Sequence, residues 1–193
     1  MTTLLLVRHG ETDWNREGRY QGQADPGLNA RGRAQAQALA HRLRAAGWRP
    51  QVIYTSPLRR AAETAAILNQ AWQVPVRVDP RLMEIHQGAW QGLTVDEIAR
   101  RWPQLFEAWE RTPWAVRPPG GETLAEVRDR VYAAIDDIVQ RHPNDIVLVV
   151  AHRIPLAMLK IRYQGHPPEQ VRSLVVPNAG YEVVTLPPTR QVR

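Results

Sequence analysis

Residues 3–12 read TLLLVRHGET, a short apolar run that ends in a cluster of charged and polar residues. A continuous apolar run of this length predicts a buried strand of a parallel sheet, because both faces of such a strand are covered. The strand would deliver Arg8 and His9 at its carboxyl end, the edge at which open α/β sheets place their active sites. This one stretch therefore predicts both a fold class and the position of a site.

Two later stretches repeat this arrangement. Residues 52–55 read VIYT and are followed by Ser56 and Pro57, an N-cap and a first-turn proline that predict a helix running to about residue 72. Residues 146–150 read IVLVV, the most strand-like segment of the chain, and lead directly to His152. Strands that alternate with helices in this way predict an α/β fold with three layers, α/β/α, around a mostly parallel central sheet.

Weaker signals cover the rest of the chain. Alanine and leucine at helical spacing predict a helix over residues 30–46, ended by Gly47. Two capping boxes predict helices that begin near residues 95 and 124, because Thr94 and Thr123 each stand three residues before a glutamate. The segment at about 94–121, rich in proline and glycine after residue 111, is expected to form a lid. Further expected elements are brief strands at 74–78 and 180–186, an irregular or edge segment at 82–85, a helix at 154–163, a long loop at 11–29 and a loose tail at 187–193.

Composition restricts the class of protein. At 193 residues the chain has the length of one ordinary domain, so we expect a single domain over residues 1–193. The absence of cysteine excludes a disulfide framework, a thiol nucleophile and a zinc–thiolate site. The net charge of +6 comes from arginines spread along the chain, with Lys160 the only lysine, and this spread argues against a nucleic-acid-binding role. No apolar run approaches the roughly 20 residues of a spanning helix, and the first residues lack the pattern of a signal peptide. We therefore expect a cytoplasmic protein that binds neither membrane nor nucleic acid.

The three strand ends carry residues suited to one kind of ligand. Arg8 with His9, the segment 56–59 with Arg59, and His152 follow three strands whose carboxyl ends can converge in a parallel sheet. Guanidinium groups bind phosphoryl oxygens in bidentate fashion, and a neutral imidazole can attack phosphorus. These residues together predict a site for a phosphoryl group.

Several motifs extend this hypothesis along nearly the whole chain. They are RHGET at 8–12 with Trp14, Asn15, Arg19, Gln21 and Gly22; Gly32; SPLRRAAETA at 56–65; EIHQGAWQG at 84–92; PGGET at 119–123; and VVAH at 149–152. In this order they resemble the histidine phosphatase superfamily, which includes the cofactor-dependent phosphoglycerate mutases. The resemblance implies a phosphoglycerate mutase-like fold, and the segment at 84–88 is similar to the branch of broad-specificity and alpha-ribazole phosphatases.

The resemblance also implies a role for each site residue. His9 would be the nucleophile and become transiently phosphorylated, while Glu84 would protonate the leaving alcohol and then activate water. Arg8, Arg59 and His152 would bind and neutralise the phosphoryl oxygens. The remaining substrate-binding residues implied by the resemblance are Asn15, Gln21 and Gly22. This chemistry requires no metal ion and no cofactor.

Three functions remain open at this point. A phosphoglycerate mutase carries Arg, Tyr and Lys anchors just after the acidic residue, and the matching positions here are Ile85, Gln87 and Val95. Their absence favours hydrolysis of a small phosphomonoester over mutase activity, and the complete set of site residues argues against a silent phosphate-binding protein. Arg153 departs from the family pattern, which has glycine after the second histidine, and leaves the substrate undecided. We expect a monomer or a homodimer.

Overall fold

Five strands form one sheet in the computed structural model, which describes residues 1–187; positions 188–193 of the expected tail lie outside the described residues. The strands are β1 (Thr2–Arg8), β2 (Val52–Thr55), β3 (Val76–Val78), β4 (Ile146–Ala151) and β5 (Tyr181–Leu186), in the order β3-β2-β4-β1-β5. The first four run parallel to one another, and β5 pairs antiparallel with β1. The predicted α/β fold with a mostly parallel sheet is therefore confirmed.

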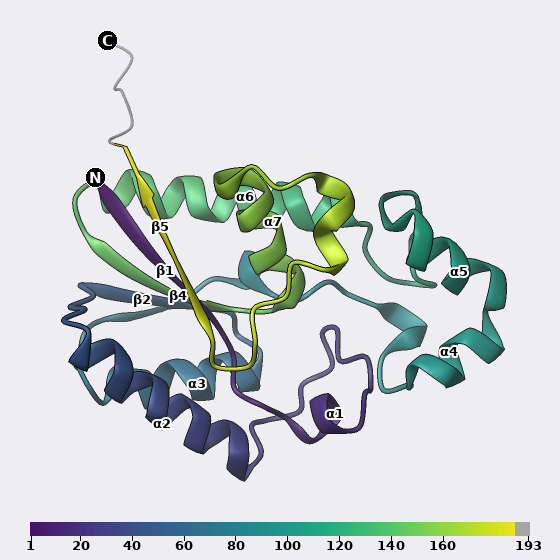
Figure 1. Cartoon of the computed structure of the whole chain (residues 1–193), viewed down its shortest axis with the longest axis horizontal. Coiled ribbons are helices and arrows are strands. Elements are labelled where there is room, and N and C mark those ends of the chain that lie inside the picture. The colour runs from purple at the N-terminus through teal and green to yellow at the C-terminus, as the bar shows by residue number, and fades with distance from the viewer. Residues whose placement is uncertain (188–193) are drawn as a thin grey trace.

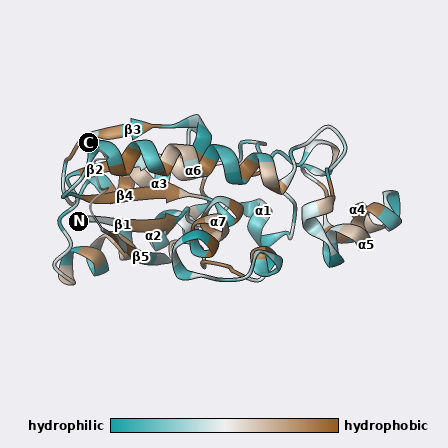
Figure 2. Cartoon of the chain, turned by 90° about the horizontal axis from the view of Figure 1, so that it is seen from above, coloured by the Kyte–Doolittle hydropathy of each residue, from teal (hydrophilic) through white to brown (hydrophobic). Residues whose placement is uncertain are grey.

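Helices cover both faces of the sheet (Figure 1). On one face lie α2 (Ala30–Ala45) and α3 (Arg59–Asn69), and on the other lie α6 (Leu124–Arg141) and α7 (Arg153–Gln164). Leu4 and Leu6 belong to the core on the α6 and α7 side, whereas Leu5 and Val7 belong to the core on the α2 and α3 side. Successive residues of a strand point to opposite faces, so a strand between two helical layers must be apolar at every position. Figure 2 shows these hydrophobic strands between more polar helix surfaces.

Strand pairing brings the predicted site residues to one edge of the sheet. In the register of β1 with β4, Arg8 stands opposite Ala151, and the His9 amide donates to the Ala151 carbonyl at 3.2 Å. On the other side of β4, the Ser56 amide donates to the Val150 carbonyl at 3.1 Å. The ends of β1, β2 and β4 therefore converge as the sequence predicted.

Two helix starts differ from the prediction. A short helix, α1 (Asp13–Arg16), lies inside the segment expected to be a loop, and its capping box pairs Thr12 with Asn15. This capping box was not predicted from the sequence, because its third helical position is an asparagine and not the usual glutamate or glutamine. Helix α3 begins at Arg59, with Leu58 as its N-cap, rather than at Ser56 and Pro57. Ser56 instead uses its hydroxyl to accept the Leu58 amide and to contact His152.

A helical arm projects from the sheet domain (Figure 1). It contains α4 (Val95–Arg101), which begins at the predicted capping box, and α5 (Pro103–Arg111). Phe106 and Trp109 of α5 pack edge-on against Trp90, with ring centroids 6.0 Å and 5.9 Å from it. Short 3-10 helices are η1 (Pro80–Leu82), η2 (Gly88–Trp90), η3 (Pro113–Ala115) and η4 (Pro168–Arg172). Movement of this arm as a lid stays a prediction. No helix within residues 1–187 has both the length and the apolar character needed to span a membrane.

Candidate active site

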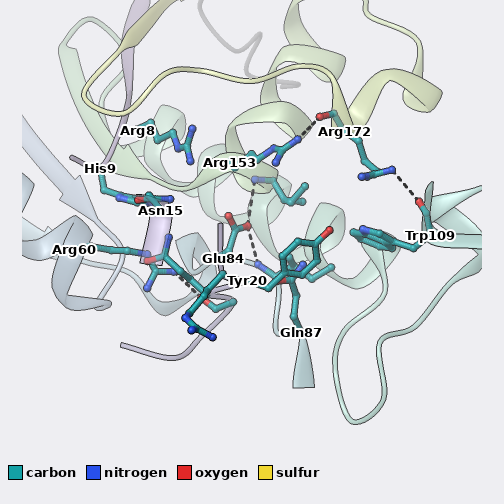
Figure 3. A pocket seen from close by; sticks show the side chains of 15 residues that line it. Arg8, His9, Asn15, Tyr20, Arg60, Glu84, Gln87, Trp109, Arg153 and Arg172 are labelled. Atoms are coloured by element: carbon teal, nitrogen blue, oxygen red, sulfur yellow. Dashed lines mark hydrogen bonds between the residues drawn. The ribbon is translucent and has the colours of Figure 1, made fainter. Parts of the chain in front are cut away.

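A pocket lies where the strand ends converge (Figure 3). It is lined by Arg8, His9, Asn15, Arg19, Tyr20, Gln21, Gly22, Arg60, Glu84, Ile85, Gln87, Trp109, Arg153, Ile154 and Arg172. Five of these residues are arginines and one is a glutamate, so the pocket is strongly cationic. A cavity lined in this way concentrates anionic ligands.

His9 is held as a neutral ring with one defined tautomer. Its side chain is buried, and Nδ1 lies 2.7 Å from the Gly10 carbonyl oxygen. A carbonyl can only accept, so Nδ1 carries the proton and Nε2 keeps its lone pair. Burial, together with the positive charges of Arg60 and Arg8, holds the pKa of His9 well below its usual value. The geometry therefore presents an unprotonated nitrogen as a nucleophile near neutral pH.

His152 lies beside His9, with the two ring centroids 5.2 Å apart. Its Nε2 is 2.8 Å from the Ser56 hydroxyl, which also accepts the Leu58 amide. When the hydroxyl donates to Nε2, the proton of the neutral ring lies on Nδ1, which is buried and has no partner within residues 1–187. Burial and the nearby Arg60 lower the pKa of His152 well below its ordinary range. His152 is thus placed as a donor for a ligand bound at His9.

Arg8 and Arg60 supply buried positive charge on the same site. Arg8 donates to the Val176 carbonyl at 2.9 Å, and Arg60 donates to the carbonyls of Ala24 and Gly22 at 2.8 and 2.6 Å. Within residues 1–187 neither makes an ion pair with a carboxylate. Burial lowers the pKa of Arg8, and it lowers the pKa of Arg60 to about 10, so both groups remain charged near pH 7. Two charged groups without carboxylate partners fit a phosphoryl ligand.

The expected placement of Arg59 in this site is wrong. Its side chain is 65% exposed, pairs with Glu63 at 3.4 Å and does not line the pocket. Successive residues on a helix are about 100° apart, so only one of two adjacent arginines can face the site. That residue is Arg60, which is 1% exposed and stands four and eight residues before the buried Thr64 and Leu68. Helical spacing within the motif could have distinguished the two.

The other predicted substrate-binding residues, Asn15, Gln21 and Gly22, all line the pocket. Asn15 accepts the Thr12 amide at 3.1 Å, and the Thr12 hydroxyl donates to Gln21 at 2.7 Å, so these side chains support each other. Gly22 has a positive φ of 50°, and a Cβ there would lie 2.4 Å from the side-chain oxygen of Gln91. Only glycine fits where the Gly22 carbonyl receives Arg60.

Glu84 lies between η1 and η2, and its side chain lines the pocket (Figure 3). Its Oε1 accepts the backbone amides of Ile85 at 2.9 Å and Ile154 at 3.2 Å. The second amide belongs to the first turn of α7, so the carboxyl group is oriented by the same helix that follows His152. This position suits a group that exchanges a proton with a ligand bound at His9.

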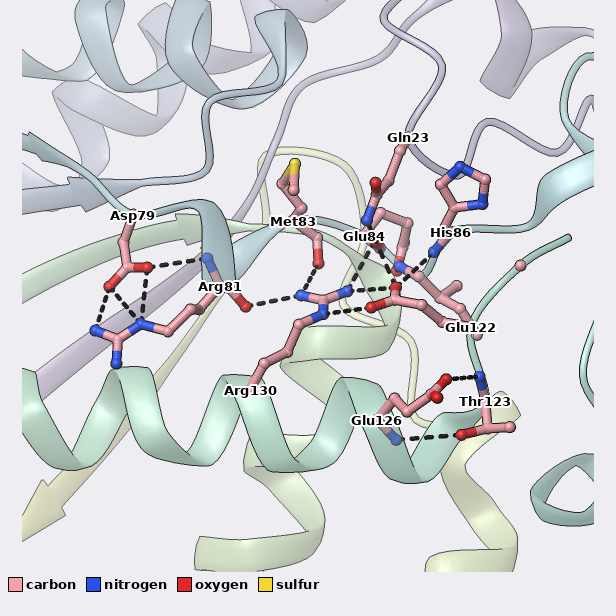
Figure 4. Close-up of polar contacts among 12 residues, drawn as sticks. Gln23, Asp79, Arg81, Met83, Glu84, His86, Glu122, Thr123, Glu126 and Arg130 are labelled. Carbon is pink, nitrogen blue, oxygen red and sulfur yellow. Dashed lines mark hydrogen bonds and ion pairs between the residues drawn. The ribbon is translucent and has the colours of Figure 1, made fainter.

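Arg130 holds the segment that carries Glu84 (Figure 4). It projects from α6 and uses all five of its N–H donors: on the carbonyls of Arg81, Met83 and Glu84 at 2.6–2.9 Å, and on both oxygens of Glu122 at 2.9 Å. Glu122 in turn accepts the His86 amide at 2.8 Å. Arg130 is not among the residues predicted from the sequence, although a charged residue on the apolar stripe of Val127 and Ala134 is a signal of a buried role.

Arg130→Met is expected to lower both stability and turnover. The change leaves Glu122 and three backbone carbonyls without their donor, which costs about 2–4 kcal/mol of unfolding free energy. Loss of the clamp also lets Glu84 shift, and we expect kcat to fall at least about tenfold with a smaller change in KM. Denaturant unfolding and steady-state kinetics test this. Arg128→Met, an exposed arginine of the same helix, is the control, and equal effects of the two changes would contradict a positioning role.

Comparison with known proteins agrees with this geometry. The family model of the histidine phosphatase superfamily (branch 1) matches residues 4–192, and the chain belongs to that superfamily. It is 38% identical to phosphoserine phosphatase 1 of Hydrogenobacter thermophilus, over 100% of this chain and 90% of the relative. It is also 38% identical to a 2,3-bisphosphoglycerate-dependent phosphoglycerate mutase of Brucella anthropi, over 94% of this chain and 90% of the relative. Among solved structures, the mycobacterial glucosyl-3-phosphoglycerate phosphatase in complex with VO3 superposes with a TM-score of 0.85 at 34% identity, over 95% of this chain and 90% of that one. The chain therefore has both phosphatase and mutase relatives, and its own class is a phosphatase-type enzyme of this superfamily.

Proposed function

We propose that this chain hydrolyses a small phosphomonoester through a phosphohistidine on His9. The observation that carries the proposal is the state of His9, a buried neutral ring whose Nδ1 is occupied by the Gly10 carbonyl and whose Nε2 is available. Arg8, Arg60 and Glu84 line the same pocket as His9, and the His152 ring lies beside it with its centroid 5.2 Å away.

In the first step, Nε2 of His9 attacks phosphorus and the bond from phosphorus to the leaving oxygen breaks. Protonated Glu84 gives its proton to that oxygen, so an alcohol departs and a carboxylate remains. Arg8, Arg60 and the Nδ1 proton of His152 stabilise the negative charge on the phosphoryl oxygens. In the second step, the Glu84 carboxylate takes a proton from water as the water oxygen attacks phosphorus, and the bond from phosphorus to nitrogen breaks to release phosphate.

Water is the proposed acceptor because this chain has Ile85, Gln87 and Val95 at the positions where the mutase pattern has Arg, Tyr and Lys after the acidic residue. Ile85 is buried and apolar, and Val95 lies on the exposed start of α4. Phosphoserine phosphatase 1 and the glucosyl-3-phosphoglycerate phosphatase are similar proteins named for hydrolysis. The similarity to the Brucella mutase makes phosphoglycerate mutase the second candidate.

A single assay separates the two candidates. The protein is incubated with p-nitrophenyl phosphate and, separately, with 3-phosphoglycerate plus catalytic 2,3-bisphosphoglycerate, while inorganic phosphate and 2-phosphoglycerate are both measured. Phosphate release from the substrates, at rates well above that of isomerisation, supports the hydrolase. Isomerisation that exceeds phosphate release would establish the mutase instead, and activity on neither would leave a phosphate-binding protein.

A further inference from the structure

The pocket contains a further cationic group, Arg153, that the proposed chemistry at phosphorus does not use. Arg153 is the first residue of α7 and follows His152 directly. Its guanidinium donates to the Arg172 carbonyl at 2.6 Å, while its Nε is buried without a hydrogen-bond partner within residues 1–187. Figure 3 shows it between Arg8 and Arg172, directed along the pocket wall.

Arg153 differs from a structural arginine in how few of its donors the protein uses. Arg130 has all five N–H groups bonded to protein acceptors, whereas the part of the chain that the structure describes offers Arg153 a single carbonyl. Nor does Arg153 pair with a carboxylate in that range, unlike Arg19 with Glu17 and Arg172 with Glu110. A half-buried guanidinium with most donors unused is arranged for an external acceptor.

The charges around the pocket define what that acceptor would be. Within residues 1–187, Arg8, Arg60 and Arg153 make no ion pair with a carboxylate, and in the first step of the proposed mechanism Glu84 carries a proton and so adds no charge. Burial lowers the pKa of Arg8, the Glu84 carboxyl group opposes that shift, and the positive charge of Arg153 adds to it, so the guanidinium groups of Arg8 and Arg153 repel each other. A phosphoryl dianion matches two of the three positive charges, which leaves one for a monoanionic group elsewhere on the substrate.

The position of Glu84 sets the direction in which that group lies. Its carboxyl group is bonded to the Ile154 amide, the residue next to Arg153, so the leaving oxygen that Glu84 protonates faces the start of α7. The organic part of the leaving alcohol then extends towards Arg153, with Tyr20 and Trp109 lining the same part of the pocket. Burial raises the pKa of Tyr20, so its phenol stays protonated and can donate.

We infer that Arg153 binds a carboxylate on the leaving group, and that the substrates of this enzyme are phosphomonoesters of hydroxy acids. The inference rests on the proposed function for the phosphoryl end of the substrate. Arg172 acts as a positioning residue, since its carbonyl holds Arg153 while its own guanidinium is paired with Glu110 of α5 and lies 5.9 Å from the Trp109 ring centroid. A planar guanidinium matches a carboxylate in bidentate fashion, which a lysine at this position would not reproduce.

Two compounds of nearly equal size test the inference: 3-phosphoglycerate carries the carboxylate, and glycerol 3-phosphate has a hydroxymethyl group instead. Wild type is expected to prefer 3-phosphoglycerate in kcat/KM by roughly 10- to 100-fold, the range of one charge-assisted hydrogen-bonded pair. Arg153→Gln should reduce this ratio to about 1–3, whereas Arg153→Lys should retain part of it. Arg111→Gln, an exposed arginine of the arm, should keep the wild-type ratio. A wild-type ratio near 1, or a ratio that Arg153→Gln leaves unchanged, overturns the carboxylate site.

A binding measurement keeps the inference separate from the proposed function. The dissociation constants of both compounds are measured by calorimetry in His9→Ala, with and without Arg153→Gln, where turnover plays no part. A preference for 3-phosphoglycerate that disappears with Arg153 supports the site even if wild type hydrolyses neither compound, a result that would overturn only the hydrolase. Equal binding of the two compounds in His9→Ala, with hydrolysis intact in wild type, overturns the carboxylate site and leaves the hydrolase standing.

Discussion

His9→Ala is expected to lower kcat/KM for phosphomonoester hydrolysis by at least about 10⁴-fold, because it removes the nucleophile on which both steps depend. Neither His152 nor Glu84 is placed to replace it. His152 has its Nε2 engaged by Ser56, and the carboxyl group of Glu84 is bonded to two backbone amides. The folded state should survive, since the ring makes one short hydrogen bond to the adjacent Gly10 carbonyl.

The phosphoenzyme gives the direct measurement. Wild type mixed with ³²P-labelled substrate and quenched in base should carry a label that is stable to base and released by acid, as expected of a phosphoramidate. His9→Ala should carry none. His152→Ala is the matched control, a second buried histidine that lies beside His9, and it should still be labelled, though more slowly. Labelling that survives His9→Ala, or is lost only in His152→Ala, would show that the nucleophile was assigned to the wrong ring.

Acid stability offers a second readout of the same residue. The pKa of His9 in the folded protein lies well below its ordinary value because of burial, so as pH falls through about 6.5 the unfolded chain takes up a proton that the folded protein refuses. The stabilising contribution of the neutral histidine to the free energy of unfolding is complete above that pH. It declines below that pH by up to about 1.4 kcal/mol per pH unit for each such histidine. His9→Asn should show a shallower decline than wild type in denaturant unfolding between pH 7 and 5. Equal slopes would mean that His9 titrates normally in the folded state.

Arg60→Met is expected to lower kcat/KM by about 10²- to 10³-fold, the effect of losing one preorganised donor to transition-state charge. Arg60 also joins the carbonyls of Gly22 and Ala24, so part of the loss comes from the loop that carries Gln21 and Gly22. Arg59→Met provides a matched control, since the same chemical change one residue earlier alters an exposed side chain that is paired with Glu63.

The comparison of these two variants is made at a temperature where both remain folded by circular dichroism. Arg59→Met should retain activity within about twofold, because exposed substitutions rarely disturb a buried site. If Arg59→Met were the more damaging change, the arrangement of α3 at the pocket would be incorrect. Adjacent arginines thus give a test in which size, charge and sequence neighbourhood are nearly constant and only the side-chain direction differs.

Much of the fold was predictable from local patterns. The apolar runs in β1, β2 and β4 had to be buried on both faces, because no polar position interrupts them. The capping boxes at Thr94 and Thr123 gave the starts of α4 and α6, since a side chain that satisfies an amide three residues ahead is a local interaction. Helix α1 and the true start of α3 were not predicted. In α1 the capping-box partner of Thr12 is an asparagine, and the N-cap of α3 is Leu58, which makes no side-chain capping bond.

Within the stretch from Thr3 to Thr12, the sequence by itself determined that a buried strand ends in a histidine with an arginine beside it, because that depends only on local apolar pattern. The order of the motifs then indicated the family of the chain and, through that resemblance, made His9, Glu84 and His152 candidate site residues. Tertiary structure alone decided that Arg60 rather than Arg59 enters the pocket, that Arg130 fixes the segment of Glu84, and that Arg153 lines the same pocket. These outcomes depend on the direction of a side chain relative to elements distant in sequence, which helix phase and strand register set only after the chain has packed.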